Sequence, residues 1–579
     1  MAIVSAKCMK YCPKDCVTVE YNARVVSSDT LIGNELWHNL SLDNRFTEMS
    51  LVWDTTQPLY VYRAEPVLSL TDYMSYIGGL ISLWFGTNGK EFLIWFLTSY
   101  RYLTCGYNYW TDQGVIGPRP LPIFGNRIGL LTKHVRQHYE WLNKYGNIYG
   151  HYVENATPVL NIADPELIKI ILIKDAHVFP ELSKAKVFVA SFHDKMLSLN
   201  ANDWRQFRLS FAPTLTSARM RQIYPRLMEC VTNLTDQLGR CPTHGNAPID
   251  IKDNPLMTRA RQMTARNAYL ELAQLLLPKW VHHWLGVDYS AGAIEYFVQA
   301  IRHNVQQRRK CPDEIYTDFI QWLMDANKKF NTTEADNKIV AVAITMTQGN
   351  YDNIATVVAM CCYELSREPE YQQKLYDELM GADTDPNTGH ITYDSLQGLA
   401  YLGAVVDETL RLHNKGYVVK RVAKYDYPLA DTGLVIEQGQ QINIPTGAIN
   451  YSSKYYQDPF TFNPDRFTPA NRNRIDTYAY LPFGTGPRMC VGWRFALLCV
   501  KLALAHVVRG YRLRRTPGTE RDIRMEFRDK VFVVIEKRVY GIYSAIPIPC
   551  DISIVDSVAY NGVGIPFPTH IPSISGRWI

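Results

Sequence analysis

The spacing of apolar residues predicts several helices along this chain. Apolar positions recur every three or four residues over 401–413, which is the pattern of a helix with one buried face. A longer run over 340–366 predicts a long helix that ends before Glu368-Pro369, because the residue before a proline avoids helical geometry. Another predicted helix begins near Val491. The proline-rich stretch 117–126 predicts rigid, extended chain instead of helix.

An apolar region near the N-terminus indicates a membrane segment. Residues 73–86 and 92–97 are mostly apolar, and charged residues separate the two runs. Neither run alone reaches the roughly 20 residues that a spanning helix needs, but together they are long enough. We therefore interpret 71–108 as a membrane segment or anchor that leaves the following chain in the cytosol. We favour the alternative that 91–107 is a shortened native anchor and that everything before it is a fusion or gene-model artefact.

Composition narrows the class of protein. The net charge is +5 over 579 residues and the basic residues are scattered, so nucleic acid is not an expected partner. Most of the 12 cysteines stand alone in helical patterns, as is typical of a reducing compartment, whereas Cys8, Cys12 and Cys16 cluster as disulfide-forming cysteines do. The sequence contains no phosphate loop or dinucleotide fingerprint. Electrons for any redox reaction would therefore come from a separate protein.

Cys490 has the sequence context of a thiolate bound to haem iron. It stands at the start of a predicted helix, whose dipole favours a negatively charged sulfur. Glycines at 484, 486 and 492 predict sharp turns and a close approach of the backbone to a flat ring. Backbone N–H groups after the cysteine are expected to point at the sulfur. An isolated cysteine beside an apolar helix is more often an inert core residue. The prediction of an iron-bound thiolate therefore depends on the glycines and the helix start around Cys490.

The pattern Phe-x-x-Gly-x-Arg-x-Cys-x-Gly over 483–492 resembles the haem-binding signature of the cytochrome P450 family. Three further motifs match the family in the same order: Asp203-Trp204-Arg205-Gln206-Phe207-Arg208, Glu408-Thr409-Leu410-Arg411, and Phe462-Asn463-Pro464-Asp465-Arg466-Phe467, where Asp465 replaces the usual glutamate. The resemblance covers 109–549. It implies a mainly α fold with a small β region, and haem b with Cys490 as the axial thiolate.

The same resemblance implies a role for each matching residue. Phe483, Gly484 and Gly492 would frame the haem beside Cys490. A second group would hold the haem propionates: Trp204, Arg208, Arg421 and Arg488. A buried charge network would join Glu408, Arg411 and Arg466.

The resemblance further implies a monooxygenase on the cytosolic side of the endoplasmic reticulum membrane. It would insert one oxygen atom from O2 into a lipophilic xenobiotic, steroid or fatty acid. NADPH-cytochrome P450 reductase would supply the electrons, and cytochrome b5 is a further candidate partner.

The expected oxygen-binding groove departs from the family pattern. Members usually carry Ala-Gly, any residue, an acid and then a threonine, and the corresponding stretch here is Gly349-Asn350-Tyr351-Asp352-Asn353. Asp352 keeps the acid, but the amide of Asn353 cannot relay a proton as a hydroxyl does. Asp352 and Asn353 are therefore expected to bind oxygen and to deliver protons to it. Poor coupling of NADPH consumption to product formation is one expected consequence. A haem-thiolate isomerase or dehydratase that rearranges lipid peroxides without a reductase is the alternative.

Three stretches lie outside the enzyme pattern. Residues 1–70 contain Cys12-Pro13-Lys14-Asp15-Cys16, and together with the following apolar segment they resemble the C-terminal part of a degenerin/epithelial sodium channel. This fragment is too short to form a channel pore. A helix typical of the enzyme family is expected to be missing near 252–253, and 550–579 resembles nothing identifiable. A misjoined, inactive chimera is thus a third hypothesis.

Overall fold

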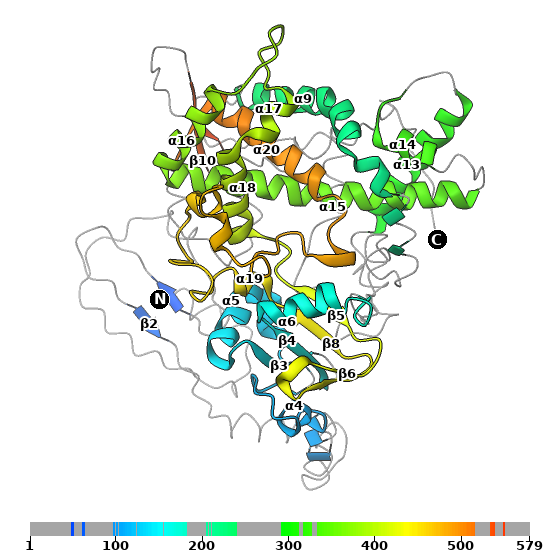
Figure 1. Cartoon of the computed structure of the whole chain (residues 1–579), viewed down its shortest axis with the longest axis vertical. Coiled ribbons are helices and arrows are strands. Elements are labelled where there is room, and N and C mark those ends of the chain that lie inside the picture. The colour runs from blue at the N-terminus through cyan, green and yellow to red at the C-terminus, as the bar shows by residue number, and fades with distance from the viewer. Residues whose placement is uncertain are drawn as a thin grey trace, which may run out of the picture. The chain divides into compact units, whose positions relative to one another are not determined.

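The computed structural model describes residues 48–50, 61–63, 97–98, 100–101, 104–122, 124–153, 156–181, 204–205, 208–209, 211–239, 291–311, 316–326, 333–515, 533–538 and 548–550 (Figure 1). The chain divides into two units, Met1–Thr98 and Ser99–Ile579. In the first unit, β1 (Glu48–Ser50) pairs antiparallel with β2 (Val61–Arg63). The clustered cysteines, most of the apolar segment, the junction at 252–253 and the tail after 550 lie outside these ranges. Of the helices within them, none offers an apolar stretch long enough for crossing a bilayer.

The second unit contains a four-stranded sheet with the strand order β3-β4-β8-β5. The strands are β3 (Ile148–Val153), β4 (Thr157–Ile162), β8 (Gln441–Ile444) and β5 (Val419–Val422). β4 pairs parallel with β8, and the other two pairings are antiparallel. Buried aliphatic side chains such as Leu160 and Ile442 form the core beneath this sheet. The sheet matters for the site because β5 carries Arg421.

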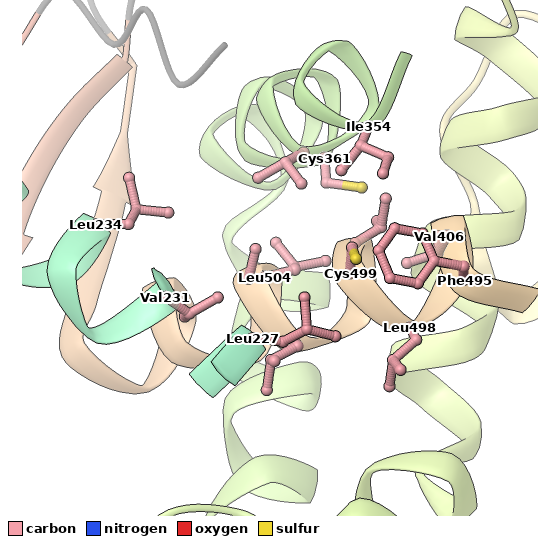
Figure 2. Packing of buried hydrophobic residues seen from close by; sticks show 14 of the residues in the cluster. Leu227, Val231, Leu234, Ile354, Cys361, Val406, Phe495, Leu498, Cys499 and Leu504 are labelled. Atoms are coloured by element: carbon pink, nitrogen blue, oxygen red, sulfur yellow. The ribbon is translucent and has the colours of Figure 1, made fainter. Parts of the chain in front are cut away.

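Helices make up the larger part of the second unit (Figure 1). The central helix is α15 (Thr333–Arg367), which contacts α13 (Ala291–Lys310), α18 (Ala400–His413) and α20 (Trp493–Gly510). Figure 2 shows side chains from α9 (Ser217–Gly239), α15, α18 and α20 meeting in one apolar cluster, among them Leu227, Cys361 and Leu498. The large apolar core therefore belongs to the helices.

The remaining elements of the second unit are short or peripheral. The other α-helices are α4 (Tyr109–Asp112), α5 (Arg127–Tyr145), α6 (Pro165–Lys169), α14 (Phe319–Ala326), α16 (Pro369–Met380), α17 (Tyr393–Gly398) and α19 (Thr446–Ile449). A π-helical turn, η3 (Ile170–Lys174), follows α6, and the 3₁₀ turns are η4 (Ala212–Leu215), η5 (Ala430–Thr432), η6 (Pro464–Phe467), η7 (Arg472–Arg474) and η8 (Gly486–Arg488). The small strands are β6 (Tyr427–Pro428), β7 (Val435–Ile436), β9 (Tyr511–Arg514), β10 (Val533–Lys537) and β11 (Ile548–Cys550).

The predicted elements agree with this architecture. The helix expected over 401–413 is α18, and the long helix expected over 340–366 is contained in α15, which begins earlier, at Thr333. Its polar first turns lack the apolar pattern, so the sequence did not reveal them. The proline-rich stretch 117–126 contains no helix within its described residues. The expectation of a mainly α fold with small sheets is confirmed.

Candidate functional site

The loop before α20 presents the Cys490 thiol at the N-terminus of that helix. The Cys490 N–H donates to the Phe483 carbonyl at 2.9 Å, which closes the loop. Partial loss of water around the thiol raises its pKa, while the Gly492 and Trp493 N–H groups and the Arg208 charge lower it. The side chain nevertheless remains open to solvent. The sulfur is therefore accessible and faces the N–H donors that the sequence led us to expect.

Two of the three loop glycines have a backbone conformation that favours glycine. Gly484 has φ +69° and Gly486 has φ +76°. A Cβ on Gly486 would lie 2.0 Å from the Leu172 carbonyl oxygen in η3, so the loop packs directly on that turn. Gly492 also lies in a turn, but its φ of −90° is one that any residue adopts, so this turn does not require glycine. Gly492 is the N-cap of α20.

Trp204 and Arg208 hold the same loop from another segment of the chain. Trp204 Nε1 donates to the Pro487 carbonyl at 3.1 Å. Arg208 Nη1 donates to the carbonyls of Pro487 at 3.1 Å and Met489 at 3.0 Å. The Arg488 guanidinium lies 4.8 Å from the centre of the Trp204 ring, a cation–π contact. Residues about 280 positions apart therefore meet around the thiol.

Arg421 and Arg488 concentrate positive charge beside the loop. Arg421 is buried on β5, where it donates to the Lys420 carbonyl at 2.7 Å. Burial, and then the neighbouring Arg488 charge, lower the pKa of Arg421 to about 10. Burial also lowers the pKa of Arg488 to about 10, although the Glu181 carboxylate opposes this. Two guanidinium groups in these surroundings are suited to binding an anion.

The structure brings Glu408, Arg411 and Arg466 together. Arg411 Nε and Nη2 donate to the two Glu408 oxygens at 2.7 and 2.8 Å, and both side chains are fully buried. Arg466 Nε lies 3.5 Å from Glu408 Oε1. The Asn463 N–H also donates to Glu408 Oε1, at 2.8 Å. This network ties α18 to the segment around η6.

Asp352 and Asn353 lie on α15, as expected for the oxygen-binding groove. Asn353 Nδ2 donates to the Gly349 carbonyl one turn earlier, at 2.6 Å. Asp352 Oδ2 lies 2.5 Å from Lys415 Nζ, in the loop after α18. The sequence did not point to Lys415, because no motif or periodicity links residues 63 positions apart. The one sequence signal that could have suggested Lys415 is its place two residues after the predicted helix 401–413.

Known proteins that are similar to this chain belong to one family. Residues 116–260 and 246–541 match the family model "Cytochrome P450". The chain is 28% identical over 470 residues to cytochrome P450 3A25 of Mus musculus, an alignment that covers 75% of this chain and 92% of that protein. It is 28% identical over 462 residues to the lithocholate 6-beta-hydroxylase of Mesocricetus auratus, covering 73% and 90%, respectively. It is 29% identical over 476 residues to cytochrome P450 3A31 of the same organism, covering 76% and 92%.

The matched residues include every candidate position from Trp204 to Cys490. Members of the matched family bind haem b through an axial cysteine thiolate and act as monooxygenases on lipophilic molecules. The family model spans most of the chain. The chain therefore belongs to the cytochrome P450 family and is a haem-thiolate monooxygenase.

Proposed function

We propose that Cys490 is the axial ligand of haem b in an enzyme that hydroxylates a lipophilic small molecule. The observation that carries the assignment is the accessible thiol at the start of α20, with the Gly492 and Trp493 N–H groups directed at its sulfur. Such donors stabilise a thiolate and moderate its electron donation to iron. When bound, the haem supplies the oxygen-activating chemistry.

The basic residues around the loop fit the two carboxylates of haem b. Trp204, Arg208, Arg421 and Arg488 would hold the propionates. The lowered pKa values of Arg421 and Arg488 support this assignment, because burial, and at Arg421 also the Arg488 charge, disfavours the positive charges, and a bound anion would stabilise them. Phe483, Gly484 and Gly492 would frame the macrocycle. The Glu408, Arg411 and Arg466 network would keep the surrounding segments in place.

The groove residues would orient water and move protons. Asp352 supplies carboxylate oxygens that can accept hydrogen bonds from water, whereas Asn353 uses one Nδ2 N–H on the Gly349 carbonyl and keeps its second N–H and its amide oxygen for water. Asn353 would therefore position a water molecule without relaying its proton. This arrangement supports oxygen activation with a larger loss to peroxide than a threonine would give.

The substrate, partners and location are proposed from relatives. The name of one relative specifies 6-beta-hydroxylation of lithocholate, so a steroid, fatty acid or lipophilic xenobiotic is the proposed substrate class. Electrons would come from NADPH through cytochrome P450 reductase, with cytochrome b5 as an additional donor. Residues 71–108 would anchor a cytosolic catalytic domain, 109–549, to the endoplasmic reticulum membrane. The ends of the two family matches overlap at 246–260, on the same stretch as the proposed missing helix.

A carbon monoxide difference spectrum of the reduced full-length protein tests the ligand. The parent and Cys499→Ala should give the absorption band that names the family, because Cys499 is buried elsewhere in α20. Cys490→Ala should lack the band. A parent without haem absorbance would support the misjoined-chimera hypothesis and overturn the proposal.

Turnover with and without NADPH separates the two enzyme classes. Monooxygenation requires NADPH and the reductase, whereas an isomerase or dehydratase would convert a lipid hydroperoxide with neither. Product from a steroid or fatty acid only when NADPH and reductase are present would support the proposal. Equal conversion of a hydroperoxide without them would favour the alternative.

A further inference from the structure

Asn350 on α15 carries a buried amide donor without a protein partner. Only 9% of the residue is exposed. Its Nδ2 atom has no hydrogen-bond partner among the described residues. A buried unpaired donor destabilises a fold, so its presence calls for a bound group that the protein itself does not supply. Members of the family usually carry glycine at this position, so the amide departs from the family pattern.

Asn350 lines a cavity whose walls are mostly apolar. Leu215 from η4 and Phe495 from the first turn of α20 form parts of the same wall. Thr214 also lines the cavity, but its hydroxyl already donates to the Phe211 carbonyl at 2.7 Å. The cavity therefore combines apolar walls with the unpaired N–H of Asn350.

Three of the segments around this cavity also belong to the proposed haem site. α15 carries the groove residues, α20 follows the Cys490 loop, and η4 follows the segment that contains Trp204 and Arg208. The propionates form the polar edge of haem b, whereas its other edges carry methyl and vinyl groups. The apolar walls of the cavity suit such an edge.

The Asn350 amide is oriented by the start of α20. Its Oδ1 atom lies 4.0 Å from the point that a Cβ on Gly492 would occupy. Gly492 is the N-cap of α20, and the positive end of a helix dipole favours an oxygen there. This orientation leaves the Nδ2 atom, which is the positive end of the amide dipole, for the cavity.

We infer that Asn350 raises the reduction potential of the haem by presenting its amide N–H to an apolar edge of the macrocycle; the inference rests on the proposed haem site. Reduction takes up one electron, which the reductase of the proposed function would supply, and adds one negative charge. An unpaired donor in apolar surroundings stabilises added negative charge more than it would in water. Asn350 therefore favours the reduced form.

Leucine at position 350 tests this role, because it keeps the bulk of the side chain and removes the dipole. In Asn350→Leu we expect a more negative potential, with the equilibrium constant for reduction lower by about three- to tenfold. Haem content should stay the same. A spectroelectrochemical titration of the full-length protein measures the potential. Asn304→Leu removes a buried asparagine of α13 that does not line the cavity, so it should keep the parental potential.

A second variant serves if leucine prevents haem binding. Asn350→Asp keeps the shape of the side chain and replaces the N–H donor with a carboxylate oxygen, so its potential should also lie below the parental value. A parental or more positive potential in either haem-bound variant would overturn the inference. If the parent shows the haem-thiolate band with carbon monoxide, that result leaves the proposed function intact. A parent without the band would overturn the proposed function and this inference together.

Discussion

Arg411 donates two parallel hydrogen bonds to the Glu408 carboxylate inside the helical core. Three further Arg411 bonds go to the carbonyls of Asn450 and Pro459, both at 2.7 Å, and Thr461 at 3.2 Å. All five guanidinium N–H donors are therefore engaged. Removing the carboxylate would leave this buried cation without its charged partner.

Glu408→Ala should consequently destabilise the protein strongly. The expected loss in free energy of unfolding is about 3–5 kcal/mol, because one partner of a buried ion pair is removed. Asp465→Ala breaks the exposed pair with Lys374 and should cost less than about 1 kcal/mol. Urea unfolding followed by circular dichroism measures both. Similar losses in the two variants would contradict a special role for the buried pair.

Gly486→Ala should weaken haem binding more than Gly484→Ala. Both substitutions place a side chain at positive φ, but only at Gly486 would the new Cβ meet a backbone atom, the Leu172 oxygen at 2.0 Å. Gly484 has open space at the same position, so it controls for backbone strain. Haem retained per protein after gel filtration measures the effect. Equal retention in the two variants would mean that the loop does not pack on η3 as described.

Acid should destabilise the sheet region through two buried histidines. Burial, followed by the nearby His134 and Lys420 charges, lowers the pKa of His151 from 6.5 to about 3. Burial also holds the pKa of His138 well below its ordinary value, with His134, His151 and Lys420 adding repulsion. The unfolded chain therefore binds more protons, so stability is complete above pH 6.5 and declines as the pH falls toward 3.

His151→Gln should reduce this acid sensitivity. The neutral amide removes one group that must protonate on unfolding, although the bond that Asn161 Nδ2 makes to the His151 ring at 2.7 Å is lost or altered. The test compares urea midpoints at about pH 7.5 and about pH 5, where histidine changes charge. His177→Gln, at an exposed position, is the control. The same pH dependence in parent and His151→Gln would exclude His151 as a cause.

Asn353→Thr should improve the use of NADPH. In the parent, Asn353 Nδ2 donates a hydrogen bond to the Gly349 carbonyl at 2.6 Å. A threonine hydroxyl can donate to the same carbonyl and can also relay a proton. Less peroxide and more product per NADPH are expected. Asn353→Val has similar bulk without the hydroxyl, so it should not improve coupling. Unchanged peroxide release in Asn353→Thr would indicate that proton delivery does not limit the reaction.

Local sequence patterns predicted the helices around the site better than they predicted contacts between residues that lie far apart in the sequence. The apolar spacing in α18 and the proline after α15 are local signals, and both led to correct elements. The Lys415–Asp352 pair and the Gly486–Leu172 contact depend on how distant segments pack, which no local pattern contains. The turn expected at Gly492 is present, but the motif could not show that its φ angle is one that any residue adopts.

The π-helical turn η3 restricts how this region can change during evolution. Loops near active sites usually accept insertions and deletions. Here the Leu172 carbonyl must face Gly486, and its direction depends on the wide turn that the Asp175 N–H closes onto the Ile170 carbonyl at 2.8 Å. One residue added or removed would rotate that carbonyl around the helix axis, away from Gly486. Side chains in η3 can therefore diverge among descendants of this chain, while the length of the turn is constrained.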